Sequence, residues 1–108
     1  MNPMYGVVHM DASGEDNPPV ESLSDLYDEL FTSGIVDGNV SVINDDNGWS
    51  ISAYRDGRLV FGKLGDPESE RHMIPVSKNR ALELWKRLID GDIQGLLKER
   101  WKPGYMEK

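Results

Sequence analysis

The chain has 108 residues, of which 38% are hydrophobic and 29% charged, and this length and composition predict one globular domain spanning residues 1–108. It contains no cysteine, which excludes disulfides, thiolate metal sites and cysteine nucleophiles, and two histidines are too few for a multi-histidine metal centre. Residues 1–10 lack the features of a secretory signal and no apolar run reaches the about 18 residues of a membrane span, so we expect a cytoplasmic protein without cofactor or metal.

Charge is distributed unevenly along the chain. Residues 1–54 hold ten acidic side chains and no Lys or Arg, whereas residues 55–108 hold twelve basic and nine acidic ones, so the halves carry −10 and +3 of the net charge of −7. Nucleic-acid binding needs cations to neutralise phosphates, which disfavours a nucleic-acid partner. Charge therefore favours a basic partner, and the alternative is that the carboxylates only keep the domain soluble.

The first third of the chain predicts a strand, a loop and a helix. Residues 5–10 form a short apolar strand candidate, and the turn-rich residues 11–19 predict a loop. Apolar side chains at helical spacing predict a helix over residues 22–32. Its inward face is expected to comprise Leu23, Leu26, Tyr27, Leu30 and Phe31. Asp25, Asp28 and Glu29 fall on its outward face.

The middle of the chain predicts a meander of antiparallel strands at residues 39–44, 49–55 and 58–64. Asp45, Asp46, Asn47 and Gly48 form the first hairpin loop, and Asp56-Gly57 forms the second. After a loop at residues 65–70, a further strand is expected over residues 72–76. The sequence thus predicts an α+β domain in which helices cover one face of a sheet of four to five strands.

The last third of the chain predicts two helices. Ser77 is the expected N-cap of a helix that runs to Asp90, and Asp92 caps a second, short helix. Trp49 and Trp85 are expected in the core. Trp101 is expected to fold back on the core and to stay partly exposed.

Motifs for catalysis or metal binding are lacking. If Gly48 were the sixth residue of a calcium loop, Tyr54 would occupy the twelfth position, where a carboxylate is required. Neither histidine has a serine or carboxylate at a recognisable spacing, so we expect no enzymatic activity. The alternative is a small-molecule-binding or catalytic domain with a pocket between sheet and helices near His72, Tyr54 and Arg55.

Three segments of the meander carry a resemblance to a known family. Residues 38–42 (GNVSV), 48–52 (GWSIS) and 55–59 (RDGRL) resemble the strand pattern of bacterial immunity proteins, which neutralise cognate polymorphic or contact-dependent toxins. The resemblance covers residues 38–61 and implies a cytosolic, non-enzymatic inhibitor. It supplies no catalytic residues.

These observations predict an immunity protein that binds and occludes a cognate, basic bacterial toxin domain. Charge complementarity would raise its association rate and specificity. The side chains predicted to contact the toxin are Asp25, Asp28, Glu29, Asp45 and Asp46.

Overall fold

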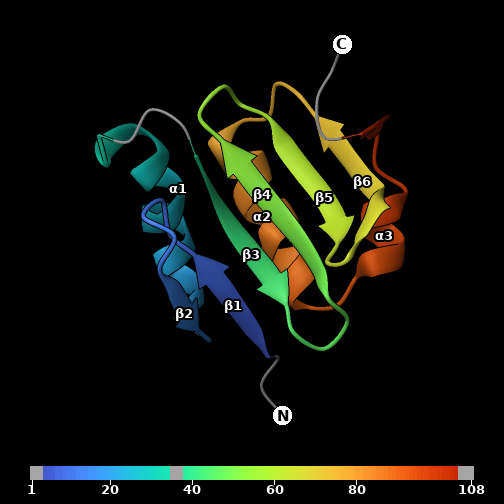
Figure 1. Ribbon diagram of the computed structural model, residues 1–108, viewed down its shortest axis with the longest axis horizontal. Helices are drawn as coiled ribbons and strands as arrows, with labels where there is room; N and C mark the ends of the chain where they lie inside the picture. Colours follow the sequence, from blue (N-terminus) through green and yellow to red (C-terminus); the bar gives the residue numbers. More distant parts are fainter. Residues whose placement is uncertain (1–3, 35–37, 105–108) are drawn as a thin grey trace.

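The computed structural model describes residues 4–34 and 38–104. Within these residues seven strands form one antiparallel sheet in the order β2-β1-β3-β4-β5-β6-β7 (Figure 1). The α+β class agrees with the prediction, but the sheet is larger than the expected four to five strands. The strands are β1 (Tyr5–Val8), β2 (Gly14–Asp16), β3 (Asn39–Asn44), β4 (Trp49–Tyr54), β5 (Leu59–Lys63), β6 (Asp66–Met73) and β7 (Lys102–Pro103).

The helices begin where the sequence places their caps. A 3₁₀ turn, η1 (Val20–Ser22), leads into α1 (Leu23–Thr32), and α2 (Lys78–Ile89) and α3 (Ile93–Leu97) follow the sheet. The Ser77 hydroxyl accepts a hydrogen bond from Arg80 N, and the Asp92 carboxylate accepts one from Gly95 N, as N-caps do. These two predicted caps are therefore confirmed. Ser22, which the sequence also favours as an N-cap, makes no side-chain capping bond at the start of α1, because its hydroxyl donates to Pro19 O instead.

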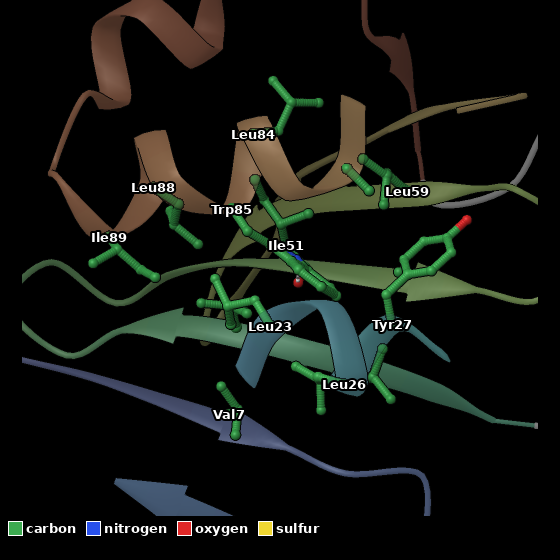
Figure 2. Close-up of a cluster of buried hydrophobic side chains, with 14 of the residues drawn as sticks. Val7, Leu23, Leu26, Tyr27, Ile51, Leu59, Leu84, Trp85, Leu88 and Ile89 are labelled. Atoms are coloured by element: carbon green, nitrogen blue, oxygen red, sulfur yellow. Dashed lines mark hydrogen bonds between the residues drawn. The ribbon is translucent and has the colours of Figure 1, made fainter. Parts of the chain in front are cut away.

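α1 and α2 cover one face of the sheet and enclose the core, whereas Figure 1 looks onto the opposite face, which no helix covers in the described part of the chain. Trp85 of α2 lies at the centre of this core with no exposed surface (Figure 2). Trp49 and Trp101 are partly buried against it, and the Trp101 indole N–H donates to Leu96 O at 2.7 Å. The predictions for Trp85 and Trp101 are confirmed, whereas Trp49, expected in the core, is only partly buried against it.

The two edge strands, β2 and β7, account for the difference in strand number, and β6 begins earlier than the strand predicted at residues 72–76. The segment predicted as a loop at residues 11–19 contains β2, which pairs with β1, and the chain between them turns tightly, with His9 N donating to Ser13 O. The segment predicted as a loop at residues 65–70 opens β6, which ends at Met73, before the expected end at residue 76. Both segments are polar and carry glycine or proline, which edge positions tolerate and central strands do not.

Phe31 is the one residue of the predicted inward face of α1 that is not buried. Its exposure is 52%, whereas Leu30 is 1% exposed. One residue advances about 100° around a helix, so Phe31 lies at the edge of the apolar stripe rather than at its centre. There it contacts the ring of Tyr27, with ring centroids 5.9 Å apart.

Candidate interaction surface

The acidic first half and the basic second half of the sequence occupy different sides of the folded molecule. Strand order in the sheet nearly follows chain order, so residues before Arg55 form β2, β1, β3 and β4 together with α1. The basic residues lie in the turn between β4 and β5, on β5, β6 and α2, and in later segments. We call the side formed by β2, β1, β3, the loop at residues 45–48 and α1 the acidic side, since no Lys or Arg comes from these segments.

The three predicted contact residues of α1 have different surroundings. Asp28 accepts a hydrogen bond from Lys78 Nζ at 2.8 Å, so a cation of α2 reaches into the acidic side. Glu29 accepts from Met10 N and lies 2.7 Å from His9 Nδ1. Asp25 is exposed, and no cation of the described residues lies within 4 Å of it. Asp28 and Glu29 are therefore engaged in contacts within the chain, whereas Asp25 is available to bind a partner.

Asp45 and Asp46 lie exposed in the hairpin loop between β3 and β4, which we call the acidic hairpin (residues 45–48). Backbone bonds and one buried side chain fix this loop: Asp45 N donates to Met4 O, and Asp46 N donates to the Asn44 side chain. Gly48 closes it at a φ of +77°, a conformation that favours glycine. The two carboxylates are thus presented on a fixed loop, without a cation of the described residues beside them.

His9 joins β1 to two carboxylates of the acidic side. Its Nδ1 lies 2.7 Å from Glu29 of α1, and its Nε2 lies 3.1 Å from Glu15 of β2. The hydrogen bond with Glu29 raises the pKa of His9, Glu15 adds to this effect, and partial burial opposes it. Because both ring nitrogens bind carboxylates, His9 clamps β2 and α1 and is not placed to act as a general base.

This clamp predicts a pH dependence of stability. A histidine whose folded pKa exceeds its unfolded value of about 6.5 contributes its full stabilisation below that value and loses it as pH rises through the folded pKa. We therefore expect the free energy of unfolding to fall by about 1 kcal/mol or less above pH 6.5, since Glu15 is half exposed and solvent screens its pair. Urea unfolding of the parent and His9→Gln across pH 5.5–9 would measure it. An unchanged difference between the two proteins over this range would contradict the clamp.

Carboxylates of the same chain engage the arginines of α2. Arg87 binds both Asp92 and Glu99, and Arg80 binds Glu83 and Glu99. The hydrogen bond from Arg87 lowers the pKa of the Glu99 carboxyl, against the effect of its burial. These cations tie α2 to the segment after α3, so this part of the basic side is neutralised internally.

A hollow of about 410 Å³ lies on the face of the sheet that α1 and α2 leave open. We call it the open-face hollow. It is lined by Ser50, Ser52, Tyr54, Val60, Gly62, Lys63, Leu64, Gly65, Asp66, Pro67 and Glu70. Its border therefore combines hydroxyls, the carboxylates of Asp66 and Glu70, the ammonium of Lys63 and apolar side chains.

Glu70 crosses the floor of this hollow. A Cβ built on Gly62 would lie 3.1 Å from Glu70 Cγ, so the lack of a side chain at Gly62 leaves the space that Glu70 occupies. The Glu70 side chain is half-buried, and no cation of the described residues lies within 4 Å of its carboxylate. A carboxylate without an ion pair in its own chain can bind a cation of a partner.

The residues considered for a small-molecule pocket do not gather in one place. Tyr54 lines the open-face hollow, and the guanidinium of Arg58 lies 3.9 Å from the centre of its ring. Arg55 is exposed at the end of β4. His72 is 1% exposed and donates from Nδ1 to Gly104 O at 2.8 Å, which leaves Nε2 buried without a hydrogen-bond partner. His72 does not line the hollow.

Sequence reasoning missed Glu70, Gly62 and Leu64. Glu70 lies in, and Leu64 lies beside, the segment interpreted as a loop, and the polar run over residues 65–70 shows no alternation that would have identified a strand there. Leu64 is 59% exposed, and its N–H donates to Gly48 O, so it lies beside the acidic hairpin. The approach of Glu70 to Gly62 depends on strand register and is not visible in the sequence.

Among the described residues, no helix is long and apolar enough to cross a membrane, and no three His, Asp or Glu side chains are grouped as metal ligands. Comparison of the chain with protein families, curated proteins and solved structures found no match.

Proposed function

We propose that the protein is an immunity protein that binds a basic bacterial toxin domain and blocks its active site or substrate groove. The observation that carries this proposal is the spatial separation of charge, in which the elements of the acidic side contribute no Lys or Arg. Lys78 is the cation of α2 that pairs with this side, through Asp28. A contiguous field of one sign steers an oppositely charged partner during its diffusional approach.

The exposed carboxylates of the acidic side are available to a basic partner, and exposed cations such as Lys86 and Lys98 lie on elements outside that side. Arg80 and Arg87 already bind carboxylates of the same chain. On the acidic side, Asp25, Asp45 and Asp46 are exposed and have no ion pair with a described residue. Of the five residues predicted to contact the toxin, these three are therefore available to a partner. The other two, Asp28 and Glu29, bind groups of the same chain.

The histidine geometry also supports a binding protein. Both ring nitrogens of His9 face carboxylates, and the ring of His72 is buried away from the hollow. A general base needs an accessible nitrogen within hydrogen-bond reach of a substrate, and neither ring offers one in this arrangement. The observation in favour of the alternative, a small-molecule-binding or catalytic domain, is that Tyr54 lines the open-face hollow.

Co-expression tests the proposal directly. The probe is the C-terminal domain encoded by the reading frame immediately upstream of the gene for this chain. The protein should form a stable complex with this domain and protect cells that express it. A metabolic operon around the gene, or a folded upstream domain that neither binds nor is neutralised, would contradict immunity.

Charge reversal should slow the association with this domain. We expect Asp25→Lys/Asp45→Lys to lower the association rate about tenfold at low salt and to reduce its salt dependence, because these carboxylates contribute to steering. The matched control, Glu68→Lys/Asp90→Lys, makes the same charge change at exposed positions outside the acidic side and should have a smaller effect. Stopped-flow mixing at several salt concentrations measures both variants. Equal effects of the two pairs would mean that net charge alone matters and that the acidic side is not the approach surface.

A further inference from the structure

The acidic hairpin and the open-face hollow belong to one end of the sheet. Met4 O accepts from Asp45 N on one side of the hairpin, and Gly48 O accepts from Leu64 N on its other side. Leu64, Gly65 and Asp66 in turn form one border of the hollow. Backbone hydrogen bonds thus connect the exposed carboxylates of the hairpin to the hollow in a continuous surface.

This surface combines apolar exposure with negative charge. Met4 is 51% exposed and Leu64 is 59% exposed, and they flank the hairpin that presents Asp45 and Asp46. Exposed apolar side chains beside charged ones are typical of protein interfaces, where apolar contact supplies affinity and charge supplies orientation. The surface therefore has both components that the proposed toxin complex needs.

The hollow itself has the chemistry to receive a cationic side chain. Tyr54 and Ser50 present hydroxyl oxygens, while Val60 and Pro67 offer apolar walls for an aliphatic stem. Asp66 and Glu70 give the hollow two carboxylates against the single ammonium of Lys63, and no cation of the described residues forms an ion pair with Glu70. Lysine and arginine pack their stems on apolar surface and place their charge at a polar end, as this arrangement requires.

We propose that the toxin partner inserts a lysine or arginine side chain into the open-face hollow, where Glu70 binds its charge. The acidic hairpin and Leu64 border this contact. The inference rests on the proposed function and adds to it the location of the interface and the residue type that anchors it. It assigns Asp28 and Glu29 to the fold rather than to the interface.

Glu70→Gln tests the anchor, because it removes the charge and keeps the shape of the side chain. With the upstream-encoded domain as probe, calorimetry should show about tenfold weaker binding, the effect of losing one hydrogen bond between charged groups. Glu68→Gln is the matched control: it removes an exposed carboxylate from the same strand, outside the open-face hollow, and should bind within about twofold of the parent. Thermal unfolding of both variants should match the parent.

A second pair of variants tests the border of the hollow. Leu64→Ser should weaken binding, whereas Phe31→Ser, which alters a similarly exposed side chain at the end of α1, should not. If the parent binds the domain but Glu70→Gln and Leu64→Ser bind as the parent does, the anchor is wrong and the proposed immunity function stands. If the parent does not bind the domain, the proposed function fails and this inference fails with it.

Discussion

Trp85→Ala should lower the free energy of unfolding by about 3 to 5 kcal/mol, the range for removal of a large aromatic side chain from a core. Trp85 has no exposed surface, and its indole N–H donates to Ile51 O at 3.0 Å. Its ring also contacts the edge of Tyr27. As Figure 2 shows, Trp85 thus joins α2 to the central strand β4 and to α1, so its removal leaves a cavity where three elements meet.

Chemical denaturation of two further variants separates the contribution of the indole hydrogen bond from that of burial. Trp85→Phe keeps most of the apolar volume but leaves the Ile51 carbonyl without its indole donor, so it should cost less than Trp85→Ala. Trp101→Ala removes a tryptophan that is only partly buried and should also cost less. A loss below about 1 kcal/mol for Trp85→Ala would show that this side chain is not enclosed in solution.

Local signals in the sequence predicted most of the elements on which the core depends. The strands at residues 39–44, 49–55 and 58–64 correspond to β3, β4 and β5 to within one residue at each end, because alternating burial and short polar turns are read from neighbouring residues. Ser77 and Asp92 were predictable as caps because a cap bonds to the backbone three residues later.

The edges of the sheet were not predictable from the same signals. β2 consists of three exposed residues, and β6 begins with Asp66-Pro67, a sequence that resembles a loop. These strands form because the backbone N–H and C=O groups at the edges of β1 and β5 need hydrogen-bond partners. Those edges exist only once the rest of the sheet has assembled, so neighbouring residues do not reveal them. β7 is only two residues long and pairs with β6 across 30 residues of chain.

The residues of the candidate interaction surface were also predictable only in part. Exposure of Asp45 and Asp46 followed from their place in a turn. The engagement of Asp28 by Lys78 joins residues 50 apart in the chain, and that of Glu29 by His9 joins residues 20 apart. Helical periodicity shows which side of α1 faces outward, but it does not show which element lies beside that side. The open-face hollow likewise forms only where β4, β5 and β6 align.

Asn44→Asp should lower the free energy of unfolding at pH 7 by about 3 to 5 kcal/mol, the range for a buried charge without a counter-charge. Asn44 is 2% exposed, and its amide Nδ2 donates to Leu88 O at 2.9 Å. A carboxylate has no hydrogen to donate, so its oxygen would face the Leu88 carbonyl. It would also lie at the C-terminal end of α2, where the helix dipole disfavours negative charge.

Acidification should partly restore this variant. Burial, the carbonyl and the helix dipole all raise the pKa of the introduced carboxyl, and once protonated it can donate to Leu88 O. The penalty is therefore largest above the folded pKa and shrinks as pH falls through it. Urea unfolding at pH 7 and pH 4.5, referenced to the parent at each pH, measures this change. Asn44→Ala is the control, since it loses the hydrogen bonds to Leu88 O and from Asp46 N without adding a charge and should cost about 1 to 3 kcal/mol at both pH values. Equal penalties for the two variants at both pH values would show that the introduced carboxylate reaches water, and that Asn44 does not hold the acidic hairpin against α2 as the structure describes.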